Sequence, residues 1–410
     1  MPPPAFLEAA EIPPFSDPTP VALPPDPRLF YATVRIPSQD GDPDRFYTKR
    51  RATEIRLGVG RVALGRGDLT WDQARRMSVL KNSTDKYPLQ VADIEEFGIL
   101  DRTAQPFLGS EAGSATDASP RERYVAGINE RLARSRDKDI FLYVHGYKVN
   151  FENPVLVAAE LWHFLGYEGV FIPFAWPSRV GRLDYFGDTE SARYSARYLR
   201  EFIEFLAEET NARRIHILGY SAGTRLVAAS LHQLALVNAG RSTEEIHQRL
   251  RLGNTILVGS DLDRGIFANY LLDGLLRVQQ HLLIYESPKD KALAMALFAF
   301  GNERVGQLDP GDLTPEARRF LLGSDELALV SVANAPGYDA GKGHSYFRDS
   351  PLVSSDVLAT LRYEFSPADR GLVQDPETGV WAFPPDYLER LEAAVFRADP
   401  ELAHRARAAP

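Results

Sequence analysis

The feature that most constrains the fold of this chain is the pentapeptide GYSAG at 219–223, which follows an apolar run and precedes a helical pattern. A strand that reverses sharply into a helix leaves no room for side chains two positions either side of the central residue, and glycine meets that demand. This is the context of a nucleophile elbow, which presents a serine hydroxyl at the edge of a sheet. We therefore predict that Ser221 is a nucleophile, the alternative being a glycine-rich turn without chemistry.

Apolar runs of strand length recur along the chain, and amphipathic helical patterns lie between them. The candidate strands are 30–36, 54–64, 140–144, 170–174, 215–218, 255–258, 281–285 and 327–332, and the clearest helices are 121–136, 191–208 and 224–236. Continuous apolar strands are typical of parallel sheets that helices cover on both faces. The sequence therefore predicts an α/β fold with a doubly wound, mostly parallel sheet.

Proline and small residues indicate how this fold is bounded. Residues 1–28 contain ten prolines, which block helix and central strand and predict an extended N-terminal arm. The stretch 109–120 has the composition of a linker. Because large α/β sheets absorb long chains as one domain, we expect residues 29–372 to form one catalytic domain and residues 373–410 a C-terminal extension.

Composition excludes several classes of function. The formal net charge is −9 with scattered Lys and Arg, so we expect no nucleic-acid partner, and the absence of Cys removes disulfides, thiolate metal sites and cysteine nucleophiles. The longest apolar stretches, such as 292–301, are shorter than the roughly 20 residues of a membrane span. The N-terminus lacks the pattern of a secretory signal, which favours a cytoplasmic location. Gly58, Gly60 and Ala63 match a loose dinucleotide fingerprint, but they lie in a predicted strand, and the sequence has no H-E-x-x-H, Walker A or EF-hand motif, so we expect no metal and no cofactor. The sequence leaves the oligomeric state open.

A serine nucleophile needs a base later in the chain. His344 lies in the loop PGYDAGKGHSYF beyond the last predicted strand, where an imidazole can reach the serine. The other histidines beyond the motif fall in helical patterns, at the start of a strand or in the charged tail, at positions 232, 247, 281 and 404. We therefore predict that His344 is the base.

The acid that orients the base should follow a strand between the serine and the histidine. Asp290 comes after the predicted strand 281–285, whereas Asp261 and Asp263 come after the strand before it. We favour Asp290, because the acid commonly follows the penultimate strand, and Asp261 stays the alternative. An aspartate without this role most often caps a helix or stabilises a turn.

Two backbone amides are needed to stabilise the oxyanion that serine attack creates. One belongs to Ala222, and the turn after the predicted strand 140–144 supplies the other through Tyr147. His145, in the same turn, is either a loop-orienting residue or a core histidine.

Three further side chains are candidates for substrate binding because of their places in the sequence. Tyr220 is in the serine motif, Lys148 follows the oxyanion turn, and Trp176 follows the strand 170–174. Aromatic residues at such positions are as often plain core packing.

The chain resembles the GYSAG-bearing α/β-hydrolases long catalogued as a domain of unknown function, which include bacterial carboxylesterases. The resemblance covers roughly residues 30–362 and rests on FYATVR, VHGY, FAWPS, GYSAG, SDLD, YESPKDKAL and GHSYF. It implies a triad of Ser221, Asp290 and His344, an oxyanion hole at Tyr147 and Ala222, and no cofactor. Two positions depart from the family pattern: Lys148 stands where Asn is usual, and the sequence GSD at 259–261 replaces APD.

From these residues we expect a carboxylic ester hydrolase that acts on a small-molecule ester through an acyl-enzyme. The same groups would serve an amidase, a peptidase or an acyltransferase, and sequence alone does not separate these reactions. A different class is a catalytically silent α/β-hydrolase fold that acts as a binding protein.

Overall fold

The computed structural model describes residues 5, 28–64, 89–108, 119–178, 185–290, 293, 303–335, 344 and 346–400. The proline-rich arm, apart from Ala5 and Arg28, and the small-residue linker, apart from Ser119 and Pro120, lie outside these residues. All residues that the sequence places in the candidate site are described.

The fold is built on one sheet of eleven strands, in the order β10-β11-β9-β8-β7-β6-β4-β5-β1-β2-β3. Every pairing from β11 through to β1 is parallel, and antiparallel pairing is confined to the two ends, at β1-β2, β2-β3 and β10-β11. The strands are β1 Arg28–Pro37, β2 Tyr47–Leu64, β3 Leu89–Ile99, β4 Asp139–Val144, β5 Val170–Ala175, β6 Arg214–Tyr220, β7 Leu252–Val258, β8 His281–Glu286, β9 Leu327–Ser331, β10 Val373–Gln374 and β11 Trp381–Ala382. The prediction of a mostly parallel sheet is therefore confirmed.

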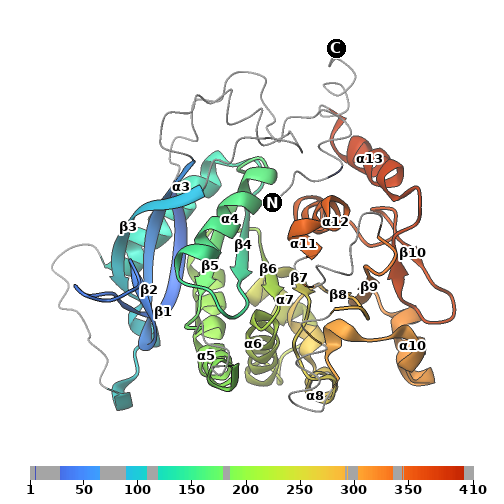
Figure 1. The fold of residues 1–410 in the computed structure, drawn as a ribbon, viewed down its shortest axis with the longest axis horizontal. Helices are drawn as coiled ribbons and strands as arrows, with labels where there is room; N and C mark the ends of the chain where they lie inside the picture. Colours follow the sequence, from blue (N-terminus) through green and yellow to red (C-terminus); the bar gives the residue numbers. More distant parts are fainter. Residues whose placement is uncertain are drawn as a thin grey trace.

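Helices cover both faces of this sheet (Figure 1). One hydrophobic core lies under α3, α5, α6 and α7, and a second lies on the opposite face under α4, α12 and α13. The α-helices are α3 Pro120–Arg134, α4 Glu152–Phe164, α5 Tyr185–Glu209, α6 Gly223–Val237, α7 Thr243–Leu250, α8 Arg264–Leu272, α10 Pro315–Gly323, α11 Tyr346–Asp349, α12 Pro351–Tyr363 and α13 Tyr387–Ala398. Short 3₁₀ helices are η1 Asp101–Thr103, η2 Pro106–Leu108, η3 Leu275–Val278, η4 Val305–Gln307 and η5 Pro310–Asp312. The doubly wound architecture is confirmed.

Burial explains why the central strands have such uniform sequences. All six residues of β4 and of β5 are buried, because helices press on both faces of these strands. In α6, by contrast, the buried residues recur at helical spacing, with Leu226, Val227, Leu231 and Leu234 facing the sheet. The continuous apolar runs in the sequence therefore correspond to strands buried on both faces, and the periodic runs correspond to helices buried on one face.

Residues 373–398, near the C-terminus, extend the sheet by two short strands and add a helix to one of its cores. β11 pairs in parallel with β9, and α13 contributes Leu391 and Val395 to the core that also contains α12. Figure 1 shows β10 and α13 at the end of the sheet opposite β1, β2 and β3. Residues 373–398 are therefore continuous with the sheet of the expected catalytic domain.

Among the described residues, no helix combines the length and the apolar character that crossing a membrane requires.

Candidate active site

Ser221 occupies a strained turn between β6 and α6. Its φ of 53° is in the left-handed region, and its N–H donates to the carbonyl of Val258 at 2.9 Å. A methyl group on Gly223 would lie 2.4 Å from the carbonyl oxygen of His145 and 2.5 Å from that of Val144, so only glycine fits there. The expected elbow is present, and Ser221 is only 4% exposed.

The structure brings Ser221, His344 and Asp290 together in one hydrogen-bonded chain. His344 Nε2 lies 2.7 Å from Ser221 Oγ, and His344 Nδ1 lies 2.8 Å from Asp290 Oδ2. Asp290 is fully buried, whereas the imidazole keeps some exposed surface. An imidazole whose Nδ1–H donates to a carboxylate presents the lone pair of Nε2 to the serine hydroxyl. This arrangement suits proton transfer from the serine.

The turn after β8 holds Asp290 in place. Its backbone N–H donates to the carbonyl of Ser287 at 3.1 Å, and its own carbonyl accepts from Gln307 Nε2 at 3.3 Å. The carboxylate oxygen that does not face His344, Oδ1, accepts the N–H of Leu293 at 3.2 Å. Both carboxylate oxygens therefore have a hydrogen-bond donor.

Asp261, the alternative acid, forms ion pairs with two arginine side chains. Its carboxylate pairs with Arg225 Nε at 2.9 Å and with Arg304 Nε at 3.6 Å, and Asp261 and Arg304 are almost completely buried. Asp263 accepts the N–H of Ile266 at 3.0 Å and caps the N-terminus of α8. Both aspartates have the structural roles that loop aspartates commonly have.

The turn after β4 lies directly against Ser221. A methyl group on Gly146 would lie 3.0 Å from Ser221 Cβ and 3.4 Å from its Oγ, so this turn brings the neighbouring Tyr147 close to the serine. Burial raises the pKa of the Tyr147 hydroxyl, and the Asp261 carboxylate acts in the same direction. Lys148 has a left-handed φ of 63°, and its ammonium lies over the Tyr147 ring at 5.1 Å.

His145 and Trp176 form a buried stack beneath this turn. Their rings are parallel with centroids 5.3 Å apart, and Trp176 Nε1 donates to the carbonyl of His145 at 2.7 Å. Burial lowers the pKa of His145 to about 3, and the Arg35 guanidinium adds to this effect, so the imidazole stays neutral. Trp176 has no exposed surface, so it lies under the site and not at the substrate position expected for it.

Arg35 also supports the turn, a role that sequence analysis did not identify. This fully buried guanidinium donates through Nε to the carbonyl of Trp176 at 3.0 Å and through Nη2 to the carbonyl of Val149 at 3.1 Å. Burial lowers the pKa of Arg35 to about 10. The only signal in the sequence was its place in FYATVR.

Tyr220, expected to contact substrate, packs against His344 and Phe347. Its ring centroid lies 5.3 Å from that of His344 and 4.9 Å from that of Phe347, and its hydroxyl donates to the carbonyl of His344 at 3.4 Å. This position supports the imidazole.

Glu286, at the end of β8, is a buried carboxyl group that sequence analysis missed. Burial raises its pKa to about 8; the Ser331 hydroxyl opposes this shift and the Asp309 carboxylate reinforces it. In the sheet register Glu286 stands opposite Ser331 of β9. The group is therefore protonated at neutral pH.

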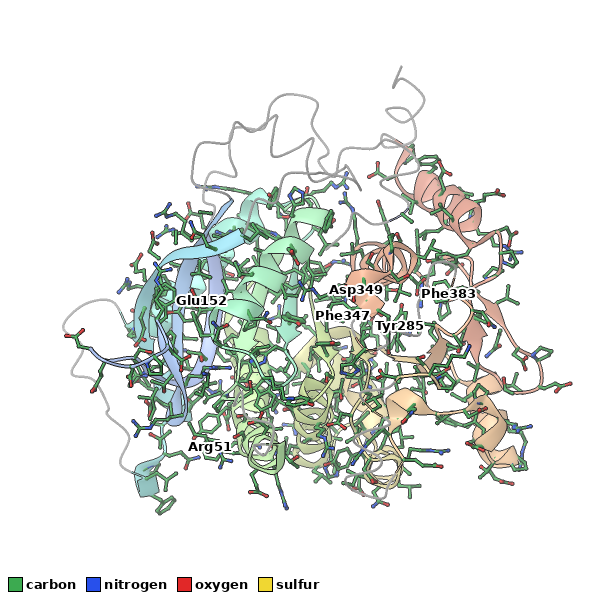
Figure 2. All side chains as sticks on the ribbon, viewed as in Figure 1. Arg51, Glu152, Tyr285, Phe347, Asp349 and Phe383 are labelled. Carbon is green, nitrogen blue, oxygen red and sulfur yellow. The ribbon has the colours of Figure 1, made fainter. Side chains whose placement is uncertain are left out.

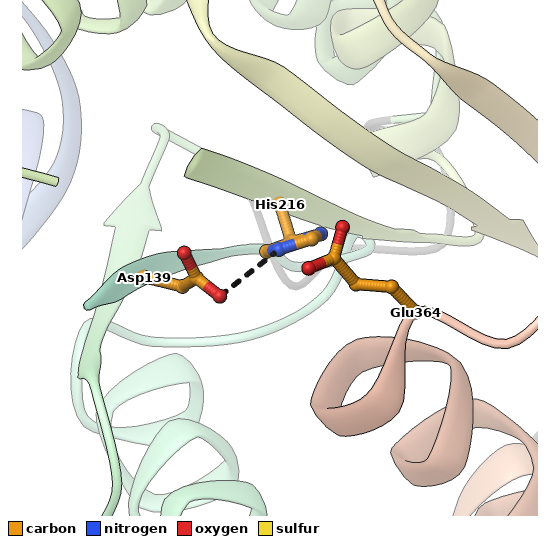
Figure 3. A group of neighbouring side chains, drawn as sticks. All are labelled: Asp139, His216 and Glu364. Atoms are coloured by element: carbon orange, nitrogen blue, oxygen red, sulfur yellow. Dashed lines mark ion pairs between the residues drawn. The ribbon is translucent and has the colours of Figure 1, made fainter. Parts of the chain in front are cut away.

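A cluster of potential metal ligands lies at the other end of the strands, where Asp139 begins β4 (Figure 3). Asp139, His216 and Glu364 offer ligand atoms that all lie within 4.8 Å of one another, in the part of the chain that the structure describes. His216 Nε2 is 3.7 Å from Asp139 Oδ2.

The hydrogen bonds around this cluster argue against a metal. Asn254 N–H donates to His216 Nδ1 at 3.0 Å, so the neutral imidazole carries its proton on Nε2 and has no lone pair there for an ion. Asp139 already pairs with Arg213 at 2.5 Å and Glu364 with Arg214 at 2.6 Å. The cluster is an ion-pair network that joins β4, β6 and the end of α12.

Comparison with known proteins identifies a family whose model the sequence matches. Residues 121–362, more than half of the chain, match the model of a family described as "Alpha/beta hydrolase of unknown function (DUF900)". Among solved structures, esterase 2 of Thermogutta terrifontis phosphoramylated by tabun is 16% identical, with 57% of this chain and 83% of that chain covered and a TM-score of 0.29. Esterase B from Lactobacillus rhamnosis, solved with a tributyrin phosphonate, is 11% identical, with 67% of this chain and 80% of that chain covered and a TM-score of 0.28. No curated protein matches the sequence.

Proposed function

Because the chain belongs to this family of α/β-hydrolases, we propose that it is a serine hydrolase that cleaves carboxylic esters through an acyl-enzyme intermediate. The observation that carries the proposal is the hydrogen-bonded chain from Ser221 through His344 to Asp290, with distances of 2.7 and 2.8 Å. The order of these residues along the chain is also the order found in α/β-hydrolases.

In this reaction the Ser221 hydroxyl oxygen attacks the ester carbonyl carbon as His344 Nε2 takes its proton. The buried Asp290 carboxylate stabilises the imidazolium that results. The imidazolium then gives the proton to the departing alcohol, which leaves the acyl group on Ser221. A water molecule, deprotonated by His344, attacks the acyl-enzyme and releases the acid.

The negative charge on the carbonyl oxygen would be stabilised by the backbone amides of Ala222 and Tyr147. Support for this pairing comes from the close approach of Gly146 to Ser221, which puts the turn after β4 beside the reacting oxygen. Ala222 directly precedes α6, so the amide end of that helix faces the same region.

Two measurements test the proposal. A fluorophosphonate probe should label wild-type protein and leave Ser221→Ala unlabelled, because the probe reacts only with an activated serine. A panel of p-nitrophenyl esters and the matching anilides should show hydrolysis of the esters. Labelling without turnover of any ester would favour an amidase, a peptidase or an acyltransferase, and absence of labelling would favour a silent binding protein.

A further inference from the structure

The hydroxyl group of Tyr346 joins the loop that carries His344 to the ends of two strands. It accepts the N–H of Gly259, which follows β7, at 2.7 Å, and it donates to the carbonyl of Tyr285, in β8, at 2.9 Å. The Tyr346 side chain is almost completely buried. Figure 2 labels Tyr285 and Phe347, which lie on the two elements that the second of these bonds connects.

Each of these strand ends leads to a group of the candidate site. Val258, the residue before Gly259, accepts the N–H of Ser221 at 2.9 Å. Five residues after Tyr285, the turn from β8 presents Asp290 to His344. One buried hydroxyl therefore connects the base to the backbone that supports the nucleophile and to the strand that supports the acid.

Gly259 also packs closely beside the imidazole of His344. It has a left-handed φ of 56°, and a methyl group placed on it would lie 3.1 Å from His344 Cε1 and 3.4 Å from Nδ1. The Tyr220 ring packs near the same imidazole, with centroids 5.3 Å apart. The hydrogen bond from Gly259 to Tyr346 fixes the distance between Gly259 and His344, which lies two residues before Tyr346 in the chain.

The Tyr346 hydroxyl keeps its proton over the whole range in which enzymes are assayed. Burial raises its pKa well above the ordinary value, and the Asp290 carboxylate acts in the same direction. The bond to the Tyr285 carbonyl, which requires that proton, therefore persists.

We propose that Tyr346 is a positioning residue for His344: its hydroxyl holds the imidazole at the distance from Ser221 and Asp290 that proton transfer requires. The inference rests on the proposed serine hydrolase function. It predicts that removal of this one buried oxygen atom slows the chemical step.

The test compares Tyr346→Phe with Tyr31→Phe in the full-length protein. Tyr31, on β1, is buried like Tyr346, and its hydroxyl bonds to the hydroxyl of Tyr47, on β2, at 2.9 Å. In the sheet, β6, β4 and β5 separate β1 from β7 and β8. Each variant keeps its ring and loses one buried hydroxyl. With a short-chain p-nitrophenyl ester, Tyr346→Phe should lower kcat by about tenfold to 100-fold, as small displacements of catalytic groups do, with little change in KM. Tyr31→Phe should leave both constants unchanged.

A spectroscopic measurement separates positioning from loss of stability. The proton between His344 Nδ1 and Asp290 should give a low-field proton resonance in wild-type protein, and this signal should broaden or disappear in Tyr346→Phe while persisting in Tyr31→Phe. Melting curves of all variants show whether the comparison is made on folded protein.

Three results would overturn the inference. They are an unchanged kcat and resonance in Tyr346→Phe, equal losses of kcat in both variants, and a Tyr346→Phe protein that does not fold, since the hydroxyl would then serve the fold as a whole. The Ser221→Ala variant distinguishes failure of the inference about Tyr346 from failure of the proposed function. If Ser221→Ala still hydrolysed the ester, the proposed function would fail, and the resonance would still decide whether Tyr346 positions His344.

Discussion

His344 Nε2 lies 2.7 Å from Ser221 Oγ, although the two residues are 123 positions apart in the chain. The contact exists because β6 and β9 are parallel members of one sheet, so the segments that follow them emerge at the same edge. That edge is where an α/β sheet commonly carries its functional groups.

Replacement of Ser221 by Ala should abolish ester hydrolysis and labelling by a fluorophosphonate. Loss of a triad serine lowers kcat on the order of 10⁶-fold in a well-studied hydrolase. The fold should persist, because the lost hydrogen bond to His344 is worth about 1 kcal/mol. Rates from the ester assay and a melting curve check both statements. Undiminished hydrolysis in a folded Ser221→Ala protein would contradict the proposed nucleophile.

Asp290→Asn and Asp261→Asn should separate a catalytic from a structural carboxylate. Asp290→Asn should lower kcat on the order of 10⁴-fold, because an amide favours the wrong tautomer of His344. Asp261→Asn should leave kcat of the folded protein nearly unchanged but reduce the free energy of unfolding by about 3 kcal/mol, since it breaks a buried pairing with Arg304 and Arg225. Kinetics combined with urea unfolding measure the two effects. The reverse ranking of kcat would assign the acid to Asp261.

Gly223→Ala should prevent stable folding, with Gly240→Ala as its matched control. The new methyl group at 223 would meet two backbone carbonyl oxygens at 2.4 and 2.5 Å, and backbone atoms on a central strand have no room to move. At Gly240 no atom lies within 4 Å of the new methyl group, so the control should unfold at the wild-type urea concentration or slightly above it. Similar unfolding midpoints for the two variants would show that the turn around Ser221 tolerates displacement.

Glu286→Gln should make the protein less sensitive to alkaline pH. The folded-state pKa of Glu286 is raised to about 8, so the folded protein holds a proton that the unfolded chain has released above about pH 4.3. This group therefore favours folding fully below about pH 4.3, and the contribution is lost as the pH rises to about 8. Urea unfolding at pH 5 and pH 8 should show Glu286→Gln gaining stability relative to wild type at the higher pH, by a few kcal/mol. An equal difference at both pH values would mean that Glu286 is ionised in the folded protein.

The central strands could be predicted from the sequence because burial on both faces forces an unbroken apolar run. The run Ile140–Val144, for example, coincides with β4 to within one residue. β3 was not predicted, because its sequence LQVADIEEFGI contains neither an unbroken apolar run nor a regular alternation of polar and apolar residues. It is held at the edge of the sheet partly by cross-strand ion pairs such as Arg61 with Asp93, which are recognisable only once the strand register is known.

The candidate triad could be chosen from order along the chain and from strand ends, and the structure places all three side chains in contact. The supporting residues could not be chosen in this way. Trp176 has the sequence of a site residue and is entirely buried, while Tyr346 has no motif beyond GHSYF and acts through a hydroxyl whose partners are backbone atoms. Contacts of side chains with backbone leave no pattern in a sequence, since every residue supplies the same carbonyl and amide groups.

The order of Ser221, Asp290 and His344 along the chain also determines when the candidate site is complete during synthesis. The ribosome makes Ser221 first, Asp290 next and His344 last, and β9, which precedes His344, docks against β8 only after most of the chain has emerged. A nascent chain that ends before residue 344 holds the proposed nucleophile without the proposed base. Under the proposed mechanism, unfinished or prematurely terminated copies of this protein would therefore be unable to form an acyl-enzyme.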